Sequence, residues 1–326
     1  MNGEFDLIAR HFAPLAGPEG LGLLDDAAQL APPLGHDLIL TTDANVQGVH
    51  FLTDESPDFV ARRLLRTNLS DLAAKGARPL GYLLTLALPP EADEAWIAGF
   101  AAGLAADQAV YDVALFGGDT VSTSGPLVVS IAAVGVAPAG RMLRRSGAKD
   151  GDALYVTGTV GDGGFGLDVA QGRLAGLSAA HAAYLESRYR LPEPRVAFGL
   201  KLGRSGVATA AADVSDGLVA DAGHIAKASG LAAAIEARAT PLSAAAAAVL
   251  AAAPERLADA MSAGDDYEIV FTAPPEATGV VRALAAETGL PVARIGRVHA
   301  GPAGQVAVIG RDGEPLQLGR LGYAHR

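Results

Sequence analysis

Acidic side chains that could bind metal ions lie in short clusters beside glycines or directly after apolar runs. Asp43 follows the run LILTT, and Asp119 follows VALF through Gly117 and Gly118. Three further pairs lie in loops or where a helix or strand starts: Asp25 and Asp26, Asp213 and Asp216, and Asp265 and Asp266. Each cluster alone is typical of an ordinary turn, because Asp and Gly favour turns. Together they offer carboxylate oxygens from separate elements, the ligands that Mg²⁺ prefers, usually with substrate phosphates completing its shell.

One more carboxylate, Asp71, lies on a predicted helix over residues 57–75, for which Ser56 suits the N-cap position. At ~100° per residue, the apolar side chains span an arc of roughly 180°; Asn68 falls inside this arc and Asp71 at its margin. The opposite arc carries Arg62, Arg63, Arg66 and Ser70. A polar group inside an apolar arc needs a partner. A satisfied amide beside a solvated carboxylate explains the helix at least as well as a functional pair, so both readings stay open.

The charge balance favours cation-dependent chemistry over nucleic-acid binding. The 326 residues include 25 Lys and Arg against 36 Asp and Glu, a formal charge of -11 at pH 7. A nucleic-acid binder needs a basic face instead. A protein with this charge that handles a polyphosphate needs cations, because carboxylates alone repel the substrate. Thr41 and Thr42 add hydroxyls beside Asp43. The arginines of residues 141–145 suit phosphate contact, although a solvated linker explains them about as well.

The elements that must position these residues alternate between strands and helices. Apolar stretches predict strands at 38–42, 82–88, 113–116, 127–136, 154–157 and 267–272. Helices are predicted at 57–75, 91–106, 218–229 and 278–288, and the alanine-rich tract 243–253 also favours a helix. The fold class is therefore α/β, of the α+β type. At ~150 residues per domain we expect two domains. The Gly-rich, basic segment after Ala137 places their boundary between residues 138 and 139.

Composition excludes several other classes of protein. The chain has no cysteine, which excludes disulfides, a thiolate nucleophile and Cys-ligated metal, and fits a reducing cytoplasm. Glu4 and Asp6 stand where a secretory signal would be basic and then apolar. The longest uncharged span has only about eleven mainly apolar residues, too few to cross a bilayer. We therefore expect neither a membrane segment nor a targeting signal.

Two motifs require a choice between a functional and a structural reading. Residues 161–166 satisfy G-x-G-x-x-G after a strand, but the chain then enters a helical stretch rather than a second strand with a terminal acid, which favours a tight turn into a helix. No lysine is followed by Ser or Thr, so ATP would not bind through a Walker A loop. His50 lies seven residues after Asp43, and a histidine alone is more often structural.

The ordered set of motifs resembles the thiamine-monophosphate kinase family. The matching segments are LLDDAA, TTDANVQGVHF, NLSDLAAKGARPLG, FGGDT, RSGAKDGDALYVTGTVGD, DVSDGL with DAGHIAKASG, and AGDDYEIVF. The resemblance runs from GEFDLIARHF to LGYAHR and so covers essentially the whole chain. It implies an architecture similar to that of aminoimidazole ribonucleotide synthetase. By this resemblance we expect an N-terminal metal- and ATP-binding domain (1–138) whose mixed sheet pairs across a homodimer, and a C-terminal α/β domain (139–326) that completes the active site.

The resemblance also implies an activity and roles for individual residues. The family uses ATP and Mg²⁺ to convert thiamine monophosphate to thiamine diphosphate, the final step of thiamine diphosphate biosynthesis. The magnesium shell implied by motif match is Asp26, Thr41, Thr42, Asp43, Asp71, Asp119, Asp213 and Asp216, of which Asp43, Asp71 and Asp119 are the expected catalytic residues. Gly117, Gly118, Arg145 and Ser215 match nucleotide contacts. His50, Asp265 and Tyr323 match contacts to the thiamine phosphate.

The expected reaction needs no strong general base, because a phosphomonoester acceptor, with a second pKa near 6, is largely ionised at pH 7. We expect direct in-line transfer. Rivals of the same architecture are aminoimidazole ribonucleotide synthetase, which lacks the combined motifs, and selenophosphate synthetase and a hydrogenase-maturation dehydratase, which generally need a reactive cysteine or selenocysteine. A non-catalytic cation or nucleotide sensor is the alternative from another class.

Overall fold

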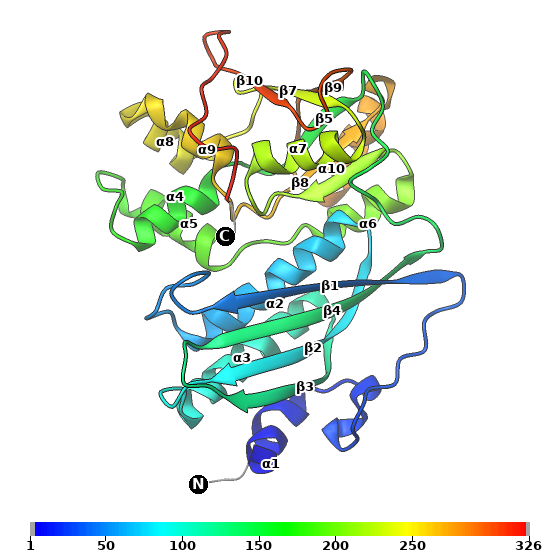
Figure 1. Ribbon diagram of the computed structural model, residues 1–326, viewed down its shortest axis with the longest axis vertical. Coiled ribbons are helices and arrows are strands. Elements are labelled where there is room, and N and C mark those ends of the chain that lie inside the picture. The colour runs from blue at the N-terminus through cyan, green and yellow to red at the C-terminus, as the bar shows by residue number, and fades with distance from the viewer. Residues whose placement is uncertain (1–3, 324–326) are drawn as a thin grey trace. The chain divides into compact units, whose positions relative to one another are not determined.

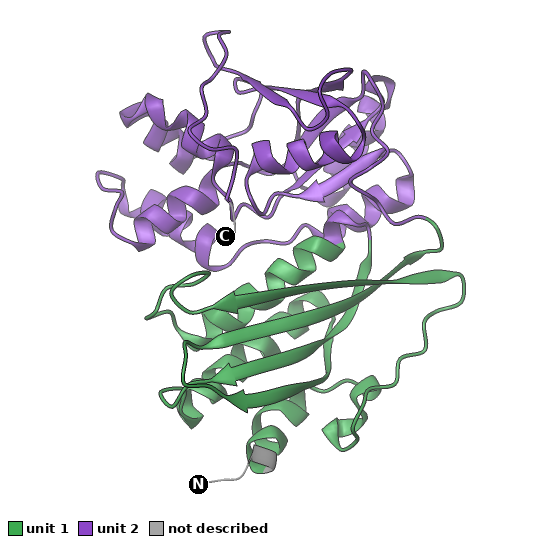
Figure 2. Ribbon diagram, in the orientation of Figure 1, with its two compact units in different colours: residues 1–72, 77–140 green, residues 73–76, 141–326 purple. Residues whose placement is uncertain are grey.

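The computed structural model describes residues 4–323, which divide into two compact units. Unit 1 comprises residues 1–72 and 77–140, and unit 2 comprises residues 73–76 and 141–326 (Figure 2). Each unit has one sheet with helices packed on it, and both sheets mix parallel and antiparallel pairs. The expected α/β class with two domains of this kind is confirmed.

Unit 1 is a four-stranded sheet in the order β1-β4-β2-β3 (Figure 1). Its strands are β1 (His36–Val46), β2 (Arg78–Leu88), β3 (Ala114–Ser122) and β4 (Val128–Pro138). Its helices are α2 (Pro57–Ala74) and α3 (Glu94–Tyr111), preceded by the short turns α1 (Glu4–Leu7), η1 (Ile8–Phe12), η2 (Ala13–Leu15) and η3 (Pro18–Leu23). Only the β2–β3 pair is parallel.

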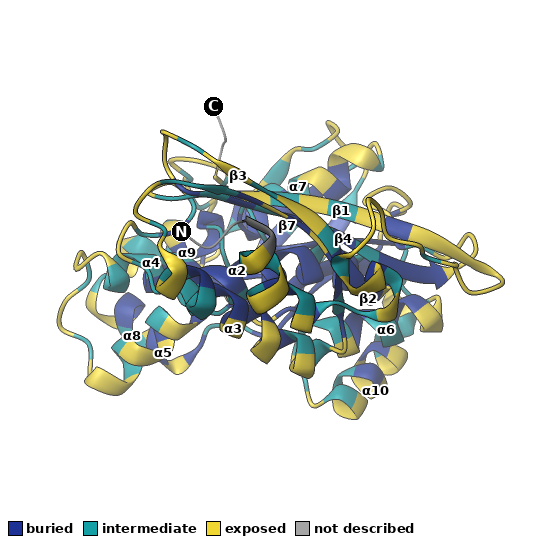
Figure 3. Ribbon diagram, turned by 90° about the horizontal axis from the view of Figure 1, so that it is seen from below, coloured by how far each residue is buried: buried dark blue, intermediate teal, exposed yellow. Residues whose placement is uncertain are grey.

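The two faces of this sheet have different surroundings. Ile131, Leu84 and Leu86 are buried on one face. Figure 1 shows α2 and α3 along one face of this sheet. Leu40 and Leu83 alternate with buried positions and are 69% and 43% exposed on the other face, which we call the open face (Figure 3). Strand alternation therefore decides which polar side chains meet α2 and which lie on the open face.

The apolar arc predicted for α2 is buried, but part of its predicted polar arc is buried too. Arg63, Arg66 and Ser70 are at most 8% exposed. Near Arg66, α3 contributes Asp107, a fully buried carboxylate. Its oxygens accept hydrogen bonds from Arg66 Nε at 2.6 Å and Arg66 Nη2 at 2.9 Å, and from Arg62 Nε at 3.1 Å. Arg62 and Arg66 thus join α2 to α3.

The predicted N-cap of α2 is wrong in one respect. The helix begins at Pro57 as expected, and Val60 donates its backbone N–H to the Ser56 carbonyl at 3.1 Å. The Ser56 hydroxyl, however, is buried without a hydrogen-bond partner among the described residues. The backbone of Ser56 therefore takes part in the first turn, whereas its side chain does not cap it.

Unit 2 is a six-stranded sheet in the order β10-β7-β9-β5-β8-β6. Its strands are β5 (Ala153–Thr157), β6 (Ala210–Asp213), β7 (Ala232–Glu236), β8 (Ile269–Ala273), β9 (Val292–His299) and β10 (Val306–Ile309). Its helices are α4 (Asp162–Ala170), α5 (Ala179–Arg190), α6 (Val196–Ser205), α7 (Leu218–Ala228), α8 (Ala244–Ala252), α9 (Leu257–Ser262) and α10 (Thr278–Thr288), with the short turns η4 (Pro254–Arg256) and η5 (Pro275–Ala277).

Helices cover both faces of the second sheet, and β5 shows the alternation. Leu154 and Val156 pack in one core with Ile225 of α7, whereas Tyr155 packs in another with Phe198 of α6. A third core joins α4, α5, α8 and α9. The alanine-rich tract forms α8 as predicted, and the Ser243 hydroxyl accepts the Ala246 N–H at 2.9 Å as its N-cap.

The six predicted strands and the predicted helices all occur, with shifts of several residues at some ends. The strands β6, β7, β9 and β10 were not predicted. Two of them, AAAD and AAAIE, are mostly alanine, which has no strand preference of its own. Among residues 4–323, no helix combines the length and the hydropathy required to cross a bilayer.

We predict that replacing Asp107 by Ala destabilises unit 1 strongly. The change leaves the buried Arg66 guanidinium without the carboxylate that neutralises its charge, and breaking a buried ion pair typically costs about 3–5 kcal/mol in the free energy of unfolding. Urea denaturation followed by circular dichroism measures this loss. Asp54→Ala, at an exposed position, serves as the control and should change little. Equal losses in the two variants would contradict the proposed role of the ion pair.

Candidate functional site

Thr41 and Asp43 of β1 face α2, and each is hydrogen-bonded to a side chain of that helix. The Thr41 hydroxyl donates to Asp71 Oδ2 at 2.6 Å, and the Asp43 backbone N–H donates to Asn68 Oδ1 at 3.1 Å. Asn68 is fully buried and also donates through Nδ2 to the Leu64 carbonyl at 2.9 Å. The satisfied-amide reading of Asn68 is therefore correct, and the amide holds β1 against α2 at the level of the two carboxylates.

Thr42 lies on the opposite face of β1. Its hydroxyl donates to the Ile131 carbonyl at 2.9 Å, and the residue is exposed. Adjacent strand residues alternate between faces, so Thr42 belongs to the open face and Thr41 does not. The two neighbouring hydroxyls proposed from the sequence therefore lie in different surroundings.

Asp119 lies at the other edge of the sheet and on its other face. On β3 it is in register with Thr85 of β2, which is in register with Ser130 of β4, and Ser130 with Ala44 of β1. Asp119 therefore shares the open face with Ala44, whereas Asp43 faces the helices. Three strand spacings, roughly 14 Å, separate β3 from β1. Within unit 1 the structure thus places Asp43 near Asp71 but leaves Asp119 apart from both.

The glycines before Asp119 differ in what they permit. A Cβ on Gly118 would lie 1.9 Å from the Leu84 carbonyl oxygen, whereas a Cβ on Gly117 would meet only Leu83 Cδ2, at 3.4 Å. Gly118 is thus required by the close approach of β3 to β2 whatever its role toward a nucleotide. Gly117 has no comparable backbone conflict.

Two other predicted site residues of unit 1, Asp26 and His50, form hydrogen bonds with residues close to them in the sequence. Asp26 is exposed, and its backbone N–H donates to Asp25 Oδ1 at 2.8 Å. Nδ1 of His50 accepts the Val46 backbone N–H at 3.1 Å, so the neutral ring carries its proton on Nε2. The imidazole therefore closes the turn after β1, and only Nε2 could donate to a ligand.

In unit 2, three segments that were singled out from the sequence lie side by side. The Asp265 backbone N–H donates to the Ser215 carbonyl at 3.0 Å, and the Tyr323 N–H donates to the Asp216 carbonyl at 2.9 Å. Tyr267 N–H donates to the Val214 carbonyl at 2.8 Å. The structure thus gathers Ser215, Asp216, Asp265 and Tyr323, although they come from positions up to about a hundred residues apart.

The loop that carries Asp265 is held in a left-handed conformation. Asp265 has φ 71° and Tyr267 has φ 51°, values that non-glycine residues adopt rarely. Asp266, between them, is almost fully buried, and its two oxygens accept the Gly161 N–H at 2.7 Å and the Gly163 N–H at 3.0 Å. Burial raises the pKa of the Asp266 carboxyl well above its ordinary value.

The same contacts explain the glycines that mimic a dinucleotide motif. Gly161 has φ 87° and directly precedes α4, and a Cβ on Gly163 would lie 2.3 Å from the Asp265 carbonyl oxygen. The element that follows α4 is the helix α5, not a strand. The tight-turn reading of residues 161–166 is therefore correct.

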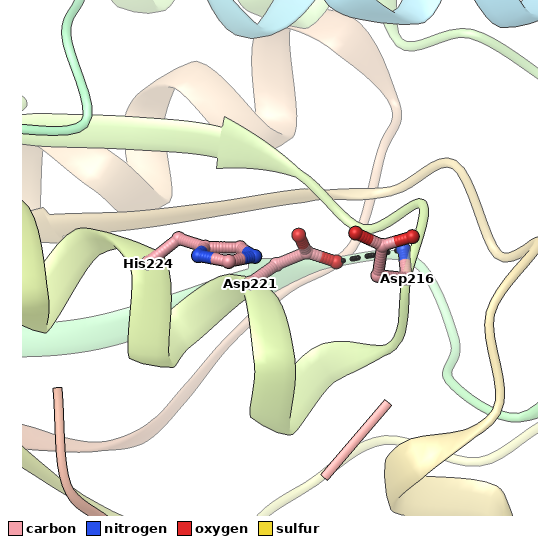
Figure 4. Close-up of side chains that lie close together, drawn as sticks. All are labelled: Asp216, Asp221 and His224. Atoms are coloured by element: carbon pink, nitrogen blue, oxygen red, sulfur yellow. Dashed lines mark hydrogen bonds between the residues drawn. The ribbon is translucent and has the colours of Figure 1, made fainter. Parts of the chain in front are cut away.

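A cluster of three side chains lies where α7 begins, as Figure 4 shows. Asp216, Asp221 and His224 each offer one ligand atom, and these atoms lie within 4.8 Å of one another. Asp221 is fully buried, and its Oδ2 accepts the backbone N–H groups of Asp216 and Gly217 at 3.1 Å each. Burial, together with the charges of Asp213 and Asp216, raises the pKa of Asp221 well above its ordinary value.

Two charged residues outside this cluster also act on it: Arg145, in the segment before β5, and Asp213, at the end of β6. Burial and the nearby charge of Arg145 lower the pKa of His224, against the opposite effect of Asp216. Arg145 also acts on Asp221. The predicted nucleotide contact Arg145 and the predicted metal ligands Asp213 and Asp216 are therefore neighbours in unit 2.

Sequence reasoning named the segments but not all of the residues that matter. Asn68 was noticed as a polar residue in an apolar arc and given no role in positioning. Asp221 and His224 lie in the segment DAGHIAKASG, which supported only a resemblance. Their spacing of three residues on one helix could have signalled a shared face. Asp216 joins them only because the preceding loop turns back toward α7.

We predict that Gly118→Ala and Gly117→Ala differ in stability although the residues are adjacent. A Cβ at position 118 forces β3 away from β2, and overpacking of this kind typically costs about 1–3 kcal/mol or more. The Gly117→Ala variant should lose less than half as much. Chemical denaturation of both variants, without any ligand, measures the difference. Similar losses would contradict the register assigned to β3.

The chain is similar to known proteins over nearly its whole length. Residues 24–137 match the AIR synthase related protein, N-terminal domain, and residues 149–309 match the corresponding C-terminal domain. The thiamine-monophosphate kinase of Caulobacter vibrioides is 49% identical over 323 residues, which cover 98% of this chain and 90% of that protein.

Two solved structures are similar in fold as well as in sequence. The crystal structure of thiamine-monophosphate kinase from Stenotrophomonas maltophilia K279a has a TM-score of 0.81 and 41% identity, covering 90% of this chain and 91% of the other. AaThiL complexed with AMPPCP and TMP has a TM-score of 0.76 and 30% identity, covering 97% of this chain and 95% of the other.

Proposed function

The chain belongs to the thiamine-monophosphate kinase family of AIR synthase related proteins, and from that membership we propose that it transfers the γ-phosphoryl group of ATP to thiamine monophosphate. The observation that carries the proposal is the identity of 49% to a thiamine-monophosphate kinase over 98% of this chain and 90% of that protein. The product is thiamine diphosphate, and the step completes its biosynthesis. The cytoplasm, where ATP is available, is the proposed location.

The donor atoms fit the magnesium ions that the family uses. Thr41, Asp43 and Asp71 present only oxygen atoms on one side of β1 and α2, and Asp213 and Asp216 add carboxylates in unit 2. Oxygen donors of this kind suit Mg²⁺. Asp26, Thr42 and Asp119 complete the proposed set; of these, Thr42 and Asp119 lie on the open face of the sheet and not beside Thr41 and Asp71. When bound, Mg²⁺ neutralises charge on the transferring phosphoryl group and helps to orient it.

The protein's own groups have mainly to bind and orient the reactants. The acceptor phosphate is largely ionised at neutral pH, so no side chain need remove a proton from it. One of its oxygens bonds to the γ-phosphorus while the bond from that phosphorus to the oxygen bridging it to the β-phosphate breaks, and ADP leaves with that electron pair. The carboxylates Asp43, Asp71 and Asp119 are the groups that would hold the cations. His50 is the proposed site residue whose side chain could act as a base, and its Nδ1 already accepts the Val46 backbone N–H.

The remaining roles follow from the motif match and are supported by position. Arg145 and Ser215 of unit 2, with Gly117 and Gly118 of unit 1, are the proposed nucleotide contacts. His50, Asp265 and Tyr323 are the proposed contacts to thiamine monophosphate. The backbones of Asp265 and Tyr323 are hydrogen-bonded to those of Ser215 and Asp216, and this proximity supports the assignment.

We predict that the full chain, given ATP, Mg²⁺ and thiamine monophosphate, forms thiamine diphosphate and ADP in equal amounts. Asp71→Asn removes a charge at the proposed magnesium site and should lower kcat/KM by roughly 10²-fold. Asp54→Asn is the matched control on the exposed surface of unit 1. Chromatography of the products measures both outcomes. Binding of ATP without turnover would instead support a nucleotide sensor.

A chirally labelled γ-phosphate should show inversion at phosphorus, and net retention would reject direct transfer.

We also propose that the open face of the unit 1 sheet pairs with a second copy of this chain. Leu38, Leu40, Leu83 and Val121 are 40–69% exposed, and their strands belong to a single sheet. Exposed apolar patches of this kind are typical of interaction sites. Asp119 and Thr42 lie on the same face, so pairing would bring these proposed ligands to the interface between copies.

We predict that Leu40→Glu converts a dimer in solution into monomers. A buried, unpaired carboxylate at each copy of the interface makes association costly. Light scattering after size-exclusion chromatography measures the mass. Leu34→Glu, at a position that is fully exposed in a loop, is the control and should leave the dimer intact. A wild-type chain that is monomeric at micromolar concentration would end the dimer proposal.

A further inference from the structure

The side chains at the start of α7 form a site that is different in chemistry from the all-oxygen groups described above. Asp221 and His224 are three residues apart on α7, a spacing that puts them on one face of the helix. Asp216 lies in the loop just before the helix. Figure 4 shows Asp221 between His224 and Asp216. The three ligand atoms, within 4.8 Å of one another, could all reach one cation.

A second observation points to an occupant. Asp221 is fully buried, and its Oδ2 accepts two backbone N–H groups, but its Oδ1 is buried with no hydrogen-bond partner. In Figure 4 only one of the two carboxylate oxygens carries a dashed line. A buried acceptor without a partner is costly, whereas a bound cation would satisfy it. Most acceptors of this kind in folded proteins are paired, so the exception at Asp221 requires an explanation.

The surrounding charges favour a cation over an anion. The charges of Asp213 and Asp216 both act on Asp221, and the charge of Arg145 acts on both Asp221 and His224. Lys227, one turn further along α7, also acts on His224. Because Arg145 is also a proposed phosphate contact, a cation here would lie beside the nucleotide phosphates.

We propose that Asp216, Asp221 and His224 bind a divalent first-row transition cation, with the imidazole of His224 as a nitrogen ligand. Two carboxylates and one imidazole suit Mn²⁺, Co²⁺ or Zn²⁺ better than Mg²⁺, which prefers oxygen throughout. The inference rests on the proposed function only through Asp216, which is also a proposed magnesium ligand. Asp221 and His224 are additional to that set. The cation would hold the loop 213–217 in the position where Ser215 can meet a nucleotide.

The test uses the chelator-treated full chain without ATP or thiamine monophosphate. Mn²⁺ is titrated against the protein, and the loss of the free Mn²⁺ signal in electron paramagnetic resonance measures binding. Pulsed measurements on the bound ion then detect modulation by ¹⁴N, which only a nitrogen ligand such as an imidazole produces. We expect one site with ¹⁴N modulation, bound in the presence of an equal concentration of Mg²⁺.

Variants of His224 and Asp221 test whether these residues supply the nitrogen ligand and the buried oxygen ligand. His224→Gln should remove the ¹⁴N modulation and weaken Mn²⁺ binding by about tenfold or more. Asp221→Asn should weaken binding similarly while the ¹⁴N modulation of any remaining bound ion persists. His181→Gln, on α5 of the same unit, is the matched control and should change neither. Circular dichroism before titration shows that each variant is folded; His224 is exposed, so its replacement leaves the core intact.

Other outcomes overturn the inference. Wild-type protein that binds Mn²⁺ without ¹⁴N modulation, or modulation that survives in His224→Gln, excludes the proposed ligand set. Displacement of Mn²⁺ by an equal concentration of Mg²⁺ excludes the preference for a transition cation. Kinase turnover is measured separately with Mg²⁺ alone. A chain that shows the nitrogen-ligated site but no turnover would sink the proposed function and not this inference, and the reverse result would do the opposite.

Discussion

The position of β1 against α2 depends on one buried amide. Asn68 accepts the Asp43 N–H and donates to the Leu64 carbonyl, and it is fully buried. Leaving either amide atom unpaired in the interior would cost about 1–3 kcal/mol, so a strand shifted along α2 is disfavoured. At this register the Thr41 hydroxyl meets Asp71. A neutral, enclosed side chain thus determines where the charged, half-exposed ones lie.

In unit 2 the loops that carry the proposed site residues are positioned by close contacts between backbone atoms. Asp266 accepts two N–H groups of the Gly161–Gly163 turn, and the neighbouring Asp265 is held at a positive φ. The glycines at 163 and 264 leave no space for a Cβ beside the carbonyl groups of Asp265 and Ser215. Because these loops touch through backbone atoms, their side chains extend from a rigid base. Such preorganisation is what phosphoryl transfer requires, since positioning supplies most of its catalysis.

Buried acids in this protein divide according to their partners. Asp107 is paired with Arg66, and Glu268 is paired with Arg188 and Arg195, so their charges are neutralised within the fold. Asp221 has only backbone donors on one oxygen and none on the other. Removing water from a charge is costly unless another charge compensates it. The first group therefore stabilises helices and loops, while Asp221 has the properties of a ligand.

Patterns over short stretches of the sequence were sufficient to predict several strands and helices and the family. The alternation in β2 and β4, the apolar arc of α2 and the alanine tract of α8 follow from side-chain periodicity and intrinsic preference, and the ordered acidic motifs determined the family. Only the tertiary structure could decide that Asp119 lies across the sheet from Asp43, that Asp107 of α3 pairs with Arg66, and that AAAD and AAAIE are strands. Those outcomes depend on pairing between residues far apart in the chain, and a propensity that acts over a few residues contains no information about distant partners.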